Sequence, residues 1–172
     1  ARQGELLALE WSDVDLENGQ LIINKTINTI DGVHIVHTPK SKTSNRKVFL
    51  SPQAVKKLAE HRSRQWEERL ASPRWDDEYD LVFASHTGTP IDPANARRIL
   101  SNIRIAAGLP KQRFQDLRHD CANLLAASGA SLLEASRWLG HSQISITADL
   151  YSHVFDDSLR KASDNLGDLL TA

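Results

Sequence analysis

The sequence offers little that would tie the chain to an oxidising compartment, a membrane or a metal ion. Its 172 residues include a single cysteine, Cys121. A lone cysteine cannot close an internal disulfide and has no thiol companion for a zinc site, which fits a reducing compartment. No apolar run approaches the ~20 residues that span a bilayer, and the first residues lack the order of a signal peptide. We therefore expect a cytoplasmic protein with no membrane contact, bound metal or cofactor.

The chain also has little excess charge of either sign. Lysine and arginine number 21 against 22 acidic residues, for a net charge of −1, whereas a nucleic-acid-binding domain is usually basic. The basic residues are nevertheless gathered in two segments, 40–47 and 94–118, which can set one face against a phosphate backbone. The alternative is an ordinary solvated surface. The side chains expected to contact DNA are Lys40, Arg46, Lys47, Arg97, Arg98, Arg104, Lys111 and Arg113.

Hydrophobic periodicity and turn residues predict a single α+β domain, mostly helical with one small three-stranded antiparallel sheet. The pair Asp31-Gly32 is a strong hairpin signal between two of its strands. The strands are expected at residues 20–27, 33–37 and 47–50, and the helices at 4–11, from 51 to about 70, 94–107, 114–128 and 131–140, with a further short helix around Tyr151.

Helix-end residues support these boundaries. Ser51-Pro52 supplies an N-cap and a first position, Ser131 with Glu134 forms a capping box, and Gly140 ends the last of these helices. Two apolar stripes are expected to face the core: Val55, Leu58, Ala59, Arg62, Trp66 and Leu70 on the first long helix, and Phe114, Leu117, Cys121 and Leu124 on a later one.

Three residues near the end of the chain form an ordered set with a chemical meaning. Arg118 follows Gln115 by three positions on a helix, so both project from nearly one face, and the helix stop before His141 directs that ring to the same region. A guanidinium held there can bind a phosphate through two donors in a fixed fork. Taken singly, an arginine, a histidine or a tyrosine such as Tyr151 is usually surface or packing. Only their order indicates a site.

The segments FQDLRHD and LGHSQISITADLYSHV resemble the catalytic boxes of the tyrosine recombinases, the phage integrase family. The resemblance covers most of the chain and implies that Arg118 and His141 are catalytic and that Tyr151 is the nucleophile. The opening ARQGELLALEW resembles the family's Arg-x-Gly-Glu-Leu box, which implies a first catalytic arginine, Arg2, with Glu5 as its acidic support.

The segment KSKTSNRKVFL resembles the hairpin that brings a catalytic lysine to the cleavage site. That resemblance implies Lys42 in this role, with Lys40 as the alternative. One position departs from the family pattern, because Gln115 stands where the family has a histidine. Glutamine forms hydrogen bonds but does not titrate near neutral pH, so the departure bears on rate and proton route.

The resemblance further implies covalent phosphoryl transfer on double-stranded DNA attachment sites, without metal. Residues 1–172 resemble the integrase catalytic domain alone, with the core-binding and arm-binding domains absent. The family's assembly implies a homotetramer on DNA through the C-terminal tail, where Leu159, Leu166 and Leu169 pack in cis or in trans, a monomer when isolated, and an accessory DNA-bending protein. A type IB topoisomerase-like enzyme and a catalytically silent DNA-binding relative remain as alternatives.

Overall fold

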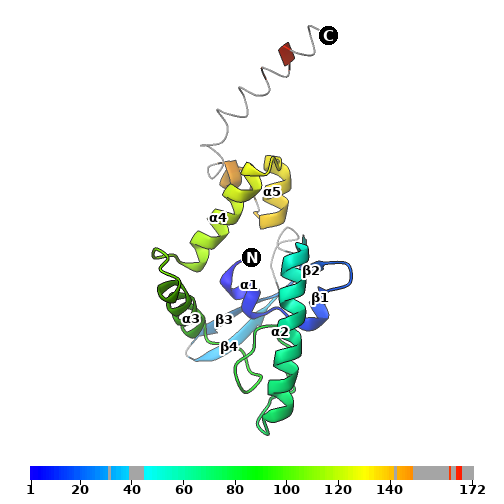
Figure 1. The fold of residues 1–172 in the computed structure, drawn as a ribbon, viewed down its shortest axis with the longest axis vertical. Coiled ribbons are helices and arrows are strands. Elements are labelled where there is room, and N and C mark those ends of the chain that lie inside the picture. The colour runs from blue at the N-terminus through cyan, green and yellow to red at the C-terminus, as the bar shows by residue number, and fades with distance from the viewer. Residues whose placement is uncertain (31, 39–44, 142, 149–162, 164–165, 168–172) are drawn as a thin grey trace.

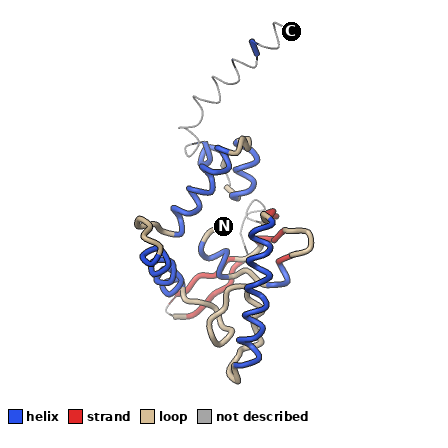
Figure 2. Tube along the Cα trace, viewed as in Figure 1, coloured by secondary structure: helices blue, strands red, loops and turns tan. Residues whose placement is uncertain are grey.

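The computed structural model describes every residue except 31, 39–44, 142, 149–162, 164–165 and 168–172. Helices and two small antiparallel sheets make up the described chain, so the predicted α+β class is confirmed (Figures 1 and 2). Within that part of the chain, no helix is both long and apolar enough to cross a membrane. The helices are α1 (Gln3–Leu7), α2 (Pro52–Ala71), α3 (Pro93–Ala106), α4 (Phe114–Ala127) and α5 (Leu132–Leu139), with a 3-10 turn at Trp11–Asp13.

The strands form two sheets where the sequence predicts one. One sheet has the order β1 (Val14–Asp15), β2 (Gln20–Ile23) and β5 (Arg46–Phe49), and the other pairs β3 (Thr26–Ile30) with β4 (Val33–His37). The expected strand at 20–27 is therefore broken after Ile23. Asn24 donates to Asp13 and Lys25 pairs with Glu10, and these contacts hold the chain where it leaves the first sheet.

The β3–β4 hairpin then passes close to α1. A Cβ on Gly4 would lie 2.6 Å from the Thr26 hydroxyl and 2.7 Å from the Ile27 carbonyl oxygen. Only glycine therefore allows α1 to approach β3 this closely. This contact fixes α1, and with it the N-terminal segment, against the second sheet.

The helix ends follow the predicted capping chemistry. The Ser51 hydroxyl accepts from the backbone of Ala54, and Asp92 caps α3 in the same way. Ser131 and Glu134 form the reciprocal capping box of α5. Gly140 ends α5 in the left-handed conformation with φ of 69°. A helical segment at residues 144–148 follows, whereas Tyr151 and the expected helix around it lie outside the described residues.

The helix faces that pack agree with the predicted stripes only in part: Leu58, Phe114 and Cys121 are packed against buried clusters as predicted, and other members are not. Trp66 and Leu70 of α2 are 56% and 72% exposed, while Gln65 is buried and binds the Trp11 indole and the main chain at Leu81. Polar partners in the interior thus shift the buried face of α2 by one position.

On α4, Leu117 and Leu124 are likewise exposed, and the buried positions are Arg118, Ala122 and Ala126. The two alanines pack against Ala135 and Leu139 of α5, because small side chains let the helices approach. Figure 1 shows α4 and α5 together at one end of the molecule.

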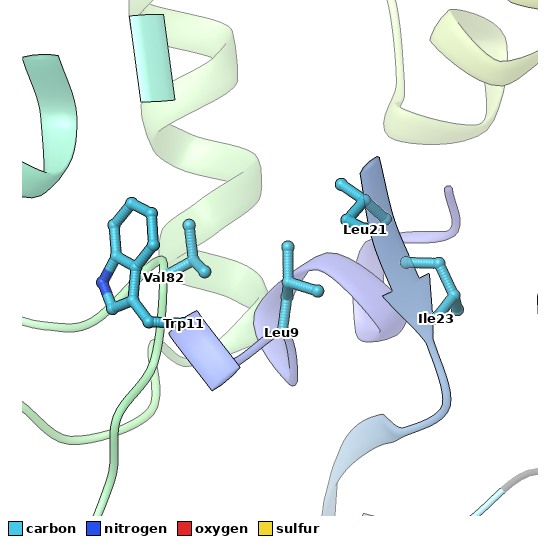
Figure 3. Close-up of a cluster of buried hydrophobic side chains, with 5 residues drawn as sticks. All are labelled: Leu9, Trp11, Leu21, Ile23 and Val82. Carbon is cyan, nitrogen blue, oxygen red and sulfur yellow. The ribbon is translucent and has the colours of Figure 1, made fainter. Parts of the chain in front are cut away.

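The main apolar core lies in the part of the molecule that holds the first sheet and α2. Leu9, Trp11, Leu21, Ile23 and Val82 form one buried cluster between the start of the chain, the first sheet and the segment after α2 (Figure 3). A second cluster joins Leu7, Ala8, Ile27 and Ala96, so it fastens α1 to β3 and α3. These two clusters hold the N-terminal segment that carries Arg2 and Glu5.

Candidate active site at the end of helix α5

Three consecutive carbonyls at the end of α5, those of residues 138–140, each receive an arginine from a different element. Nε of Arg46 on β5 donates to the first at 3.0 Å, Nη2 of Arg118 on α4 donates to the second, and Nη2 of Arg2 before α1 reaches the third at 3.5 Å. Carbonyls at a helix C-terminus lack intrahelical partners and carry partial negative charge. The arginines therefore satisfy this helix end and converge on one point.

Gly140 makes this convergence sterically possible. Its φ of 69° lies in the left-handed region, and a Cβ there would stand 2.7 Å from both Cδ and Nη1 of Arg46. The glycine thus combines two requirements, a helix stop and room for a guanidinium. It also sets the direction in which His141 leaves the helix.

Glu5 is the anion at the centre of the cluster and is buried. Its carboxylate accepts from Arg46 at 2.8 and 3.2 Å and from Arg2 through the side chain at 2.9 Å and the main chain at 2.7 Å. Burial would raise the pKa of this carboxyl, but the hydrogen bonds from Arg46 and Arg2 outweigh burial and lower the pKa to about 2. Glu5 is therefore ionised at neutral pH and joins the two arginines.

Arg118 is only 4% exposed, and its Nη1 has no hydrogen-bond partner among the described residues. Burial, followed by the charges of Arg2 and Arg46, lowers the pKa of Arg118 to about 10, so the guanidinium remains protonated at neutral pH. A buried donor without an acceptor is costly, and an anion that supplies the acceptor recovers that cost. An anionic oxygen beside Nη1 would supply the missing acceptor.

His141 follows directly, at the border of this cluster. Its Nδ1 lies 2.7 Å from the hydroxyl of Thr147, a fully buried residue in the following helical segment. Burial, followed by the charges of Arg118 and Arg2, lowers the pKa of His141 to about 4. The ring is therefore neutral at pH 7 and held in one orientation by Thr147.

The structure thus brings together four of the residues singled out in the sequence, namely Arg2, Glu5, Arg118 and His141. Gln115 lies one turn before Arg118 on α4 with an exposed side chain. Three further predicted site residues fall outside the described part of the chain: Lys40, Lys42 and Tyr151.

The predicted DNA-contacting arginines and lysines divide into two groups. The first group is exposed, as predicted, and consists of Lys47, Arg97, Arg98, Lys111 and Arg113. Arg113 is ion-paired with Asp116. Arg104 is half-buried and donates to the Leu109 carbonyl at 3.1 Å, so it closes the end of α3.

Arg46 differs most from expectation. We expected a surface DNA contact, but the side chain is buried and ion-paired with Glu5. The sequence did contain a signal, because Arg46 has the same strand parity as Val48, which packs on the main core, while Lys47 between them faces solvent. The period of the strand thus predicts the direction of Arg46 better than its charge does.

An open groove of about 700 Å³ begins at Arg2. It runs past β3 to the start of α3, where Pro93 and Arg97 line it. Arg97 also donates to the Gln3 side chain at 3.3 Å, which links α3 to α1. The groove offers main-chain and basic groups next to the arginine cluster. In the described part of the chain, no three His, Cys, Asp or Glu side chains are grouped to hold a metal ion.

Solved structures identify the class of fold. The integrase of transposon Tn1549, solved in complex with a circular intermediate DNA, superposes with a TM-score of 0.80 at 21% identity, over 96% of this chain and 54% of that one. XerA recombinase superposes with a TM-score of 0.67 at 25% identity, over 95% of this chain and 52% of that one. The mostly helical α+β architecture is therefore that of tyrosine recombinase catalytic domains.

Sequence comparison gives the family itself. The phage integrase family model matches residues 1–158, and the chain belongs to that family. Similar curated proteins include a XerC-like tyrosine recombinase of Caldanaerobacter subterraneus subsp. tengcongensis, 36% identical over 98% of this chain, and the ICEBs1 integrase of Bacillus subtilis, 29% identical over 98%. The chain spans 46% of the length of each of these two relatives.

Proposed function

We propose that this chain is the catalytic domain of a site-specific DNA recombinase that cuts and rejoins DNA through a 3′-phosphotyrosyl intermediate. The observation that carries the proposal is the buried Nη1 of Arg118, unpartnered among the described residues, on a side chain that contacts the same helix end as Arg2, directly before His141. Family membership supports the same chemistry.

The charge of the cluster suits phosphoryl transfer without a metal. Within the described part of the chain, the three arginines and one glutamate of the cluster leave two positive charges beside a neutral histidine. A phosphodiester carries one negative charge and gains another as the attacking oxygen bonds to phosphorus. Donors placed in advance stabilise that developing charge. Arg2 and Arg118 would bind the non-bridging oxygens, and His141 would donate or accept one further hydrogen bond.

In the proposed reaction the Tyr151 oxygen bonds to phosphorus and the bond from phosphorus to the 5′ oxygen breaks. The phenol proton passes to neutral His141 or to water, and Lys42, with Lys40 as the alternative, protonates the leaving 5′ oxygen. A 5′-hydroxyl from another strand then reverses the step, so the bond energy is kept and no hydrolysis occurs. Gln115 would contribute a hydrogen bond at the position where the family has a histidine.

The partners we propose are double-stranded DNA attachment sites in the cytoplasm. Relatives support this, since the XerH recombinase was crystallised on its difH substrate and the Tn1549 integrase on transposon DNA. Exposed basic side chains on α3 and β5, including Arg97, Arg98 and Lys47, would contact phosphates. We further propose a homotetramer on DNA through the C-terminal tail, a monomer when isolated, an accessory bending protein, and residues 1–172 as the catalytic domain of a longer integrase.

The test uses the protein at its natural length and a pool of nicked duplexes of randomised sequence, in EDTA. Cleavage beside a nick releases a short strand and traps the covalent adduct, which is scored as a complex that survives detergent. We expect adducts for the wild type and none for Tyr151→Phe, with equal DNA binding for both. An adduct that persists in Tyr151→Phe would show that Tyr151 is not the nucleophile.

Absence of an adduct in the wild type, with DNA binding retained, would favour the silent DNA-binding relative. Gln115→His then separates two causes. Gain of a Tyr151-dependent adduct in that variant would assign the silence to Gln115.

A further inference from the structure

One buried arginine in the cluster has no part in the proposed chemistry. Arg46 lies on β5, and its guanidinium uses both sides of its fork: Nη1 and Nη2 bind Glu5, and Nε binds the carbonyl of Trp138. Its side chain is only 6% exposed, so it does not face the solvent from which DNA arrives. Its position joins three elements, β5, α1 and α5.

We propose that Arg46 is a positioning residue for DNA cleavage, which locks the end of α5 and Glu5 together so that Arg2 and His141 face the same phosphate. The proposal rests on the proposed function. It assigns to Arg46 no contact with the substrate.

The contacts form a closed circuit through the site. From the end of α5 the circuit runs through Arg46 to Glu5, from Glu5 to Arg2, and from Arg2 back to the carbonyl of Gly140. Arg2 is half-exposed and makes its contact with the helix end at 3.5 Å, so it is the weaker link. Arg46 is buried and makes the shorter contact with the helix end, at 3.0 Å, and so it holds the geometry on which Arg2 depends.

Shape, and not charge alone, is required at this position. A guanidinium has five donors in a rigid plane and can bind a carboxylate and a carbonyl at once, whereas a lysine ammonium is a point charge on a flexible stem. The absent Cβ of Gly140 leaves space that fits the plane of Arg46, since a Cβ would lie within 2.8 Å of Cδ, Nε and Nη1. Arg46→Lys keeps the charge and removes this fit.

The experiment measures single-turnover adduct formation with the natural-length protein and a nicked duplex recovered from the randomised pool. We expect Arg46→Lys and Arg46→Gln to slow the cleavage rate constant at saturating DNA alike, on the order of a hundredfold, because small misplacement of reacting groups is enough. DNA affinity should stay within about threefold of wild type, because phosphate contacts elsewhere carry binding. The matched control is Arg69→Lys. Arg69 lies on α2 and forms an ion pair with Asp77 at 2.8 Å, and this variant should react as the wild type does.

The rate constant distinguishes positioning from a purely structural role. Partial unfolding lowers the fraction of protein that reacts, whereas a misplaced site lowers the rate constant of the whole population. A reduced amplitude with an unchanged rate constant would overturn the proposal, and so would a wild-type rate in Arg46→Lys beside a slow Arg46→Gln, because charge alone would then suffice. A wild type that forms no adduct would instead refute the proposed function.

Discussion

Apolar burial and charge pairing hold different parts of this molecule. The cluster of Leu9, Trp11, Leu21, Ile23 and Val82 consists of close-packed side chains whose removal from water stabilises the fold. The end of α5, in contrast, is held by three guanidinium groups, one carboxylate and a helix terminus. The first region holds the fold without polar contacts to the cluster, while in the second Arg2 and Arg118 both hold the helix end and are the groups proposed to bind phosphate.

The largest effect should come from removing the anion of the charged region. Glu5→Ala leaves Arg46 buried without its carboxylate, and breaking a buried pair from one side costs about 3–5 kcal/mol of unfolding free energy. Urea unfolding measures this loss of unfolding free energy. The matched control is Glu60→Ala, which removes an exposed pair with Lys57 and should cost less than about 1 kcal/mol. Equal losses in the two variants would show that burial of the charge does not matter.

A smaller loss is expected in the apolar region, and with a different signature. Leu9 is 3% exposed, and Leu9→Ala should cost about 3 kcal/mol through the lost transfer free energy and the cavity that remains. The folded fraction should cleave DNA at the wild-type rate, because Leu9 makes no contact with the arginines of the cluster. A slower rate constant at unchanged DNA affinity would show that the two regions are not independent.

The smallest expected effect is the change of folding stability with pH. The pKa of His141 falls from 6.5 to about 4 on folding, so as pH drops from about 6.5 to about 4 the unfolded chain takes up a proton that the folded chain does not. The pKa of Glu5 is lowered from 4.5 to about 2 on folding. Protonation of this carboxyl in the unfolded chain therefore adds a further loss of stability as pH drops from about 4.5 to about 2. Stability should therefore be full above pH 6.5 and decline in acid.

Urea midpoints across this range test the expectation, with His141→Gln as the control that removes the upper part of the decline. A His141 pKa at or above 6.5, measured by NMR on the free protein, would contradict it. Binding of a phosphate between the arginines offsets their charge and should raise that pKa.

Sequence alone predicted the helix ends well, because caps are local. Ser51, Ser131 and Gly140 act within a few residues of themselves, and the structure places the ends of α2 and α5 there. The buried faces were harder, since they depend on partners distant in the chain. Trp66 and Leu117 are exposed because Gln65 and Arg118 find interior hydrogen-bond acceptors that no periodicity reveals.

The candidate site shows the same division. The order of Arg118 and His141 could be read from the chain, and Arg2 was predicted from the resemblance of its segment to the integrase family. The period of the strand indicates that Arg46 points inward, but only the fold shows that Glu5 and the end of α5 lie beside that strand.

The contact between Arg2 and the Gly140 carbonyl joins positions separated by 138 residues. Closing so long a loop costs more chain entropy than forming the local contacts of a helix. The arginine cluster therefore cannot exist on a chain emerging from the ribosome until α5 has been made and docked. A chain that ends before α5 therefore carries Arg2 and Glu5 without the carbonyls that Arg2, Arg46 and Arg118 contact.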